Sequence, residues 1–172
     1  MIWIAMDDPV PAAVLVPLVG RPDGITVLLM QRTDHLNDHA GQISFPGGKA
    51  EPGDNNPVAT ALRETREEIG LSEKYIRIMG LLDDYETVTG FRITPVVSTV
   101  SDGFNLALDS REVSGVFEVP LDFICNPLNH QICTRTVNGI AGRYFVFEYK
   151  THYIWGATAG MLMNLYQRLK IQ

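Results

Sequence analysis

The chain has 172 residues, of which 45% are hydrophobic and 20% are charged. This is the balance of a folded protein with a buried core rather than of a disordered segment, and the length is most simply that of a single domain, residues 1–172. With 20 acidic and 14 basic residues the net charge is −6, so we do not expect nucleic acid to bind through an overall positive field. A small phosphorylated substrate is compatible with this balance.

Membrane insertion and export are both disfavoured. The longest apolar run, 12–20, is interrupted by a proline and is shorter than the roughly 20 residues of a spanning helix. The N-terminal segment has no basic residue and carries Asp7 and Asp8, unlike a signal peptide. Cys125 and Cys133 form no CxxC pair, which favours two free, buried or half-buried thiols. We therefore expect a cytoplasmic protein that contacts no membrane.

Alternating and β-branched residues predict strands through most of the chain. The first six predicted strands are Ala13–Val19, Ile25–Arg32, Gln42–Phe45, Tyr75–Leu82, Phe91–Thr99 and Val113–Val119. Asn138-Gly139 predicts a hairpin turn between strands at Gln131–Val137 and Arg143–Tyr149. Because only two convincing helices interrupt these strands, the pattern indicates a mixed α/β fold with antiparallel elements, not a doubly wound sheet.

The first helix has clear end signals. Asn56 can cap it, Pro57 suits its first position, and Gly70 can end it. Its apolar stripe, which should dock on the sheet, is Val58, Ala61, Leu62, Thr65 and Ile69. The second helix is predicted over Thr158–Lys170, and its stripe is Met161, Leu162, Leu165 and Leu169.

Three glutamates of the first helix share one side. Glu64, Glu67 and Glu68 are spaced i, i+3 and i+4 and should repel one another, and we expect Arg63 and Arg66 to point largely to the other side. Taken alone, such a cluster is usually a solvated helix face.

The segment before the helix favours a second interpretation. Phe45–Lys49 is a strand end followed by a glycine loop, which lets backbone approach a ligand closely, and Asp54 adds a carboxylate. Clustered carboxylates suit Mg²⁺ or Mn²⁺, and such an ion can activate water to attack a diphosphate. The two readings are a solvated surface and a metal site.

Residues 48–71 resemble the Nudix box, G-x5-E-x7-R-E-U-x-E-E-x-G-U, and the run Arg63-Glu64-x-x-Glu67-Glu68-x-Gly70-Leu71 is very specific. Asp54 stands where the box has its first glutamate, but eight residues rather than seven separate it from Arg63, and Thr65 takes an aliphatic position. The resemblance implies an α/β/α sandwich around a mixed sheet and an enzyme that hydrolyses diphosphates with Mg²⁺ or Mn²⁺.

The resemblance also implies roles for the residues of the helix. Glu64 and Glu68 match the positions that most directly ligate metal, and Glu67 matches a third ligand or base. The implied catalytic residues are Glu67, Glu68 and Arg63, the last by pairing with a box carboxylate and orienting it. Glu112 is a further candidate base, although a lone glutamate at a strand start is usually only solvated.

A second motif precedes the box. Residues 28–48 resemble the pattern L-L-T-x-R-S-x-x-L-x-x-H-x-G-x-V-x-F-P-G-G of the coenzyme A diphosphatase branch, and residues 153–159 also look like this branch. Arg32 and His39 could present cationic or hydrogen-bonding groups to phosphates, and glycines could approach the ligand. The implied substrate-binding residues are Arg32, His39, Gly47, Gly48 and Lys49. The ordinary alternatives are a surface arginine, a loop histidine and turn glycines.

The expected activity is hydrolysis of coenzyme A or its derivatives to adenosine 3′,5′-bisphosphate and 4′-phosphopantetheine, or an acyl form of it. The alternatives are a Nudix hydrolase that prefers NADH or ADP-ribose and a non-catalytic Nudix ligand sensor. The expected partner is thus a small molecule, not nucleic acid. Nudix proteins are often dimers, so a homodimer stays open, although the sequence identifies no interface.

Overall fold

The computed structural model describes residues 8–35, 40–137 and 140–170. The strands of the larger sheet are β1 (Val10–Arg21), β2 (Gly24–Arg32), β3 (Ile43–Ser44), β4 (Gly47–Lys49), β5 (Ile76–Leu81), β6 (Tyr85–Glu86), β7 (Phe91–Val100) and β8 (Val113–Pro120). Those of the smaller sheet are β9 (Gln131–Val137), β10 (Ile140–Tyr149) and β11 (His152–Trp155). The helices are α1 (Pro57–Ile69), α2 (Leu121–Cys125) and α3 (Gly156–Lys170), with 3₁₀ turns η1 (Glu73–Tyr75) and η2 (Pro127–Asn129).

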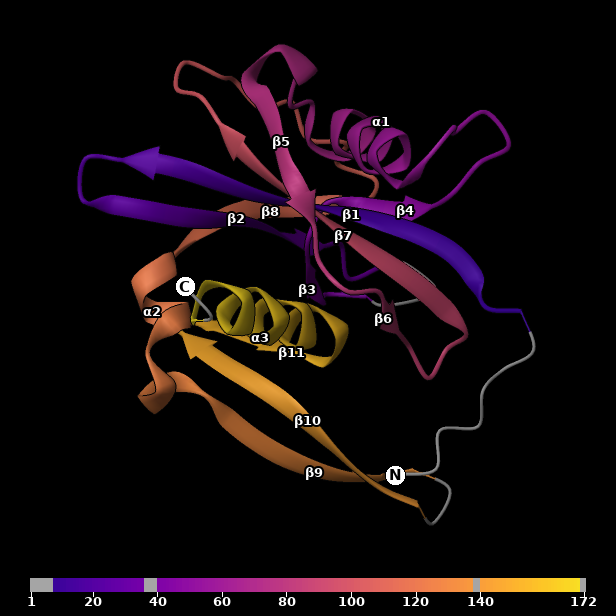
Figure 1. Cartoon of the computed structure of the whole chain (residues 1–172), viewed down its shortest axis with the longest axis vertical. Helices are drawn as coiled ribbons and strands as arrows, with labels where there is room; N and C mark the ends of the chain where they lie inside the picture. Colours follow the sequence, from indigo (N-terminus) through magenta and orange to yellow (C-terminus); the bar gives the residue numbers. More distant parts are fainter. Residues whose placement is uncertain (1–7, 36–39, 138–139, 171–172) are drawn as a thin grey trace.

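Strand β1 is the centre of the larger sheet. It pairs with β7 in parallel and with β2 and β4 antiparallel, so the sheet is mixed, as the sequence predicted. Its two faces are both covered, because α1 lies on one side of the sheet and α3 on the other (Figure 1). Ala13 and Leu15 pack with Ala61 of α1, while Val14 and Val16 belong to the core on the α3 side. This double burial explains why β1 is almost continuously apolar.

Helix α1 has the predicted ends. The Asn56 side chain accepts a hydrogen bond of 3.0 Å from the Ala59 amide, and Pro57 is the first helical residue. Gly70 closes the helix in the left-handed conformation with φ of 68°. The predicted stripe faces the sheet, with Ala61 and Ile69 fully buried.

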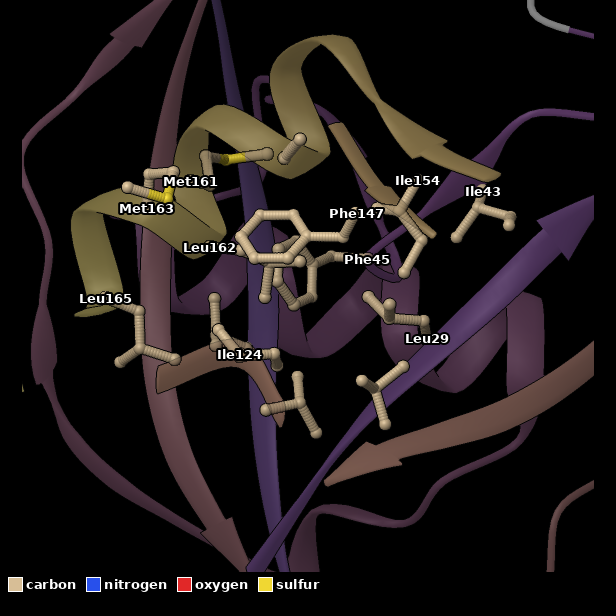
Figure 2. Packing of buried hydrophobic residues seen from close by; sticks show 14 of the residues in the cluster. Leu29, Ile43, Phe45, Ile124, Phe147, Ile154, Met161, Leu162, Met163 and Leu165 are labelled. Carbon is tan, nitrogen blue, oxygen red and sulfur yellow. The ribbon is translucent and has the colours of Figure 1, made fainter. Parts of the chain in front are cut away.

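The largest cluster of buried side chains lies between the larger sheet, α3 and the smaller sheet. Figure 2 shows Phe45 and Leu29 from the larger sheet's side packed near Phe147 of β10 and Leu162 of α3. Helix α3 begins at Gly156, two residues before the predicted start. Leu169, predicted to be part of its apolar stripe, is 40% exposed because the last turn extends beyond this core.

Several short elements were not predicted. Helix α2 contradicts the expectation of only two helices, and strands β4, β6 and β11 are also additions. Each has five residues or fewer, which is too short for a periodic pattern to stand out. Strands β9 and β10 pair antiparallel as predicted, but Asn138 and Gly139 lie outside the described residues.

The two cysteines are free and half-buried, as predicted. No helix in the described part of the chain combines the length and apolar character needed to cross a membrane.

Candidate active site

Gly47–Lys49, predicted to be a loop, forms strand β4, whose backbone reaches the first helix. Gly47 and Gly48 pair with Val14 and Ala13 of β1. Gly47 has a φ of 155°, and a β-carbon there would lie 2.6 Å from the Val14 Cα, so only glycine fits. In this position the Gly47 N–H donates a hydrogen bond of 2.9 Å to Oε2 of Glu68. The backbone of β4 therefore holds one carboxylate of α1.

Glu68 is a buried acid, only 3% exposed. Burial raises its pKa to about 8, and the negative charges of Glu64 and Glu112 act in the same direction. The Gly47 amide and Arg32, whose Nη1 lies 3.4 Å from Oε1 of Glu68, act to lower it. Glu68 is therefore held in place by donors that do not compensate fully for its desolvation.

Arg63 is the cationic centre of the acidic cluster. Its Nε and Nη2 donate to the two oxygens of Asp54 at 3.1 and 2.9 Å, and Nη2 also donates to the Lys49 carbonyl at 2.9 Å. Its Nη1 donates to Oε1 of Glu64 at 2.9 Å and to Oε2 of Glu67 at 3.2 Å. The expectation that Arg63 points away from the glutamates is wrong, because its long side chain folds back along the helix and is anchored by Asp54.

Asp54 is occupied in holding Arg63. Its Oδ2 also accepts hydrogen bonds of 2.9 Å from the Thr60 hydroxyl and from the Glu51 amide. The hydrogen bonds from Arg63, followed by the backbone bond from Glu51, hold the pKa of the Asp54 carboxyl far below its usual value. A carboxylate with these partners positions the arginine rather than a metal ion.

The carboxylates differ in how well they suit a divalent cation. Within the described residues, no three His, Cys, Asp or Glu side chains form a ready-made metal site, and Arg63 contacts Glu64 and Glu67 instead. The chemistry of the donors nevertheless fits a hard cation, because burial raises the pKa of both Glu64 and Glu68 and their charges repel each other. Glu67 is more exposed and lies beside Glu64. A bound divalent cation would relieve the repulsion among the carboxylates of Glu64, Glu67 and Glu68.

Strand β2 presents Arg32 to this cluster. The register of β2 with β8 shifts between Gln31 and Arg32, at the end of β2. Gln31 pairs with Gly115 and Arg32 with Val113, so the extra residue lies in β8. Arg32 keeps the regular alternation of β2, which places it on the same face as Met30, and Met30 packs with Ile69 of α1. The Arg32 Nε is buried without a hydrogen-bond partner, while Nη1 faces Glu68. Arg32 thus has an unused donor next to the acidic cluster.

A cavity of about 520 Å³ opens beside these residues. The structure brings together four of the predicted substrate-binding residues along its lining: Arg32, Gly47, Gly48 and Lys49. His39 lies outside the described residues. Other lining residues come from the far end of the chain and were not chosen from the sequence, among them Arg135 and Trp155. Trp155 is in the stretch that resembled the coenzyme A branch, whereas Arg135 had no motif to mark it.

Glu112 is the last residue of the loop between β7 and β8, and this loop docks on α1. Within this loop the amides of Ala107 and Asp109 donate to the carbonyls of Ile69 and Glu68, both at 2.9 Å. The Glu112 carbonyl accepts from the Thr33 amide at 2.9 Å. Its charge raises the pKa of Glu64 and Glu68, so tertiary structure brings this carboxylate near the cluster.

Comparisons with known proteins agree with this arrangement. The model of the NUDIX domain matches residues 9–134. The chain is 38% identical over 160 residues to an uncharacterized Nudix hydrolase, NudL, of Yersinia enterocolitica, which covers 93% of this chain and 82% of the relative. The fold is similar to that of a MutT protein from Methanosarcina mazei (TM-score 0.57, 18% identity, 98% of this chain and 100% of that one). It is also similar to a MutT/nudix family protein from Enterococcus faecalis (TM-score 0.59, 16% identity, 100% of this chain and 66% of that one). The chain belongs to the Nudix hydrolase family and is a diphosphatase of the mixed α/β Nudix fold.

Proposed function

We propose that this Nudix hydrolase cleaves the diphosphate bond of coenzyme A and its derivatives, with adenosine 3′,5′-bisphosphate and 4′-phosphopantetheine, or an acyl form of it, as products. The observation that carries the proposal is the convergence of Arg32, Gly47, Gly48 and Lys49 on one cavity beside Glu64 and Glu68. Arg32, Gly47 and Gly48 belong to the part of the sequence that resembles the coenzyme A branch, and Lys49 directly follows it.

The proposed chemistry divides metal binding, proton transfer and positioning among the residues of α1. Nudix hydrolases generally use divalent metal ions. Mg²⁺ or Mn²⁺ bound by Glu64, Glu67 and Glu68 would polarise the diphosphate and lower the pKa of the attacking water. Glu67 and Glu68 hold the attacking water, and Glu67 takes its proton as the water oxygen bonds to phosphorus and the bond from phosphorus to the anhydride oxygen breaks, the negative charge leaving on that oxygen. Arg63 keeps Glu64 and Glu67 in position, as its hydrogen bonds to both suggest.

The substrate side is proposed to rely on charge and on close backbone approach. Arg32 and Lys49 offset the negative phosphates, and the unpartnered Nε of Arg32 offers a donor for a phosphate oxygen. Gly47 and Gly48 line the cavity, where their backbone can approach a ligand closely. His39 keeps its proposed role as a further donor to the phosphates.

The remaining expectations also stand as proposals. We propose a single domain over residues 1–172, supported by a core that joins Val14 of β1 to Leu162 of α3. A cytoplasmic location is supported by the two free cysteines. The acidic net charge supports a small-molecule substrate over nucleic acid. A homodimer also stays open, and the molecular mass of the protein in solution tests it.

A substrate panel tests the proposal. Purified protein with Mn²⁺ is incubated with coenzyme A, NADH, ADP-ribose and capped RNA, and phosphate-containing products are separated and quantified. We expect the highest kcat/KM for coenzyme A. Equal or better turnover of another substrate would overturn the coenzyme A assignment, and binding without products would favour the sensor. Glu68→Gln serves as the control and should lose orders of magnitude in kcat while remaining folded.

A further inference from the structure

The cavity beside the acidic cluster is lined by cationic side chains from both sheets. Its charged lining residues are Arg32, Lys49 and Arg135, and among the described residues that line it none is Asp or Glu. Such a lining is unexpected in a chain of net charge −6 and favours an anion. Arg32 and Lys49 come from the larger sheet, next to Glu68 and Gly47, whereas Arg135 belongs to β9 of the smaller sheet.

The register of the smaller sheet explains why Arg135 faces the cavity. Arg135 lies opposite Gly142 of β10, and Trp155 of β11 lies opposite Val146, four residues along the same strand. Residues opposite each other, and residues separated by an even number along a strand, share a face. Arg135 and Trp155 are therefore on the same face, and both line the cavity.

Nothing in the described structure neutralises Arg135. Within residues 8–35, 40–137 and 140–170 its side chain makes no hydrogen bond or ion pair, and its cross-strand neighbour is a glycine without a side chain. By contrast, Arg32 faces Glu68, and the Lys49 ammonium lies 5.3 Å from the centre of the Phe91 ring. Arg135 is also not among the charges that chiefly act on the two carboxylates, which are Arg63, Glu67 and Glu112 for Glu64 and Glu64, Arg32 and Glu112 for Glu68.

We propose that Arg135 binds a second phosphate group of the substrate, a phosphate monoester separate from the diphosphate that is cleaved, and so determines specificity. This inference rests on the proposed function, because coenzyme A carries such a group on its ribose. The diphosphate lies against the cationic wall formed by Arg32 and the glycine loop, and the monoester reaches the opposite wall. Arg135 is a specificity residue that does not act on the reacting atoms.

The test compares ligands that differ only in the monoester. In the wild type, in Arg135→Ala and in the matched control Arg143→Ala, kcat/KM is measured for coenzyme A and for dephospho-coenzyme A. Arg143 is also exposed, but it follows Gly142 on β10 and so lies on the other face of the hairpin. We expect Arg135→Ala to lower kcat/KM for coenzyme A by about tenfold or more, the loss typical of a hydrogen bond to a charged group. For dephospho-coenzyme A it should stay within about twofold, and Arg143→Ala should change neither. Arg135→Lys should recover part of the preference.

A binding measurement separates this inference from the proposed function. Calorimetric titration of the same proteins with adenosine 3′,5′-bisphosphate and with AMP needs no turnover. We expect the wild type to bind the bisphosphate about tenfold more tightly and Arg135→Ala to lose that difference. If the wild type cleaves neither coenzyme, the proposed function fails while this titration still tests Arg135. Equal affinity of the wild type for both ligands, or equal loss for both in Arg135→Ala, would overturn the role of Arg135.

Discussion

Gly48 lies so close to Glu64 that a β-carbon at position 48 would stand 2.6 Å from the carboxyl carbon of the glutamate. The contact joins the glycine loop to the acidic side of α1, and it is made by the flexible end of a side chain. At Gly47, by contrast, a β-carbon would meet the backbone of Val14 at 2.6 Å. The two adjacent glycines are thus required for different reasons.

Gly48→Ala is expected to lower activity without unfolding the protein. The added methyl group can push the Glu64 carboxylate aside, so stability should change by less than about 1 kcal/mol while kcat falls by about tenfold or more. Urea denaturation and a Mn²⁺-dependent assay measure the two effects. Gly47→Ala is the matched comparison and should lose about 1–3 kcal/mol of stability, because backbone must move. Equal stability losses in both variants would contradict this division.

Arg63→Lys should impair catalysis through the carboxylates. Lysine cannot reproduce the paired hydrogen bonds of the guanidinium to Asp54 together with those to Glu64 and Glu67. Because Arg63 orients these carboxylates, we expect kcat to fall by about 10–100-fold and the apparent affinity for Mn²⁺ to weaken. Arg66→Lys, an exposed change on the same helix, is the control and should remain near wild type. Wild-type activity in Arg63→Lys would remove Arg63 from the site.

Glu68 should make the metal-free protein less stable at higher pH. Its pKa is raised from 4.5 to about 8 in the folded chain, so between these values the folded state binds more protons than the unfolded state. Stability is therefore greatest below the unfolded pKa and falls as pH rises through this window. In EDTA, calorimetry from about pH 5 to pH 8 should show a falling Tm, and a smaller fall in Glu68→Gln, which cannot ionise. Parallel curves for the two proteins would rule out Glu68 as the source.

The end of α1 should depend on glycine. Gly70 has a left-handed φ of 68°, and a β-carbon there would lie 2.8 Å from backbone and side-chain atoms of Ala107. Gly70→Ala is expected to cost about 1–3 kcal/mol in urea denaturation. Gly53→Ala is the control, because a β-carbon at Gly53 would meet no atom within 4 Å. Similar midpoints for Gly70→Ala and the wild type would show that the loop after α1 adapts freely.

Local sequence patterns were sufficient to predict much of the fold. The Asn56 cap, Pro57 and Gly70 act within one segment, so the bounds of α1 could be predicted from neighbouring residues alone. The long strands carried alternation or β-branched runs over many residues, whereas α2, β4, β6 and β11 were too short for such a pattern. The box residues also follow from sequence order, because their spacing along one helix determines which side they share.

The environment of those residues depended on tertiary structure. Sequence spacing suggested a solvent-facing row of glutamates, but the close packing of β4 on β1 brings the Gly47 amide to Glu68 and buries it. Arg63 turns towards Glu64 and Glu67 because Asp54, nine positions earlier, holds its other nitrogens. Glu112 and Arg135 are distant in sequence from the box, and only the docking of a loop and the register of β9 bring them towards the site. The sequence by itself thus determined the family, α1 and the carboxylates that α1 carries, since these depend on neighbouring residues. Long-range packing decided how deeply these carboxylates are buried, which charged groups surround them and which residues line the other side of the cavity. No local pattern in the sequence records such packing.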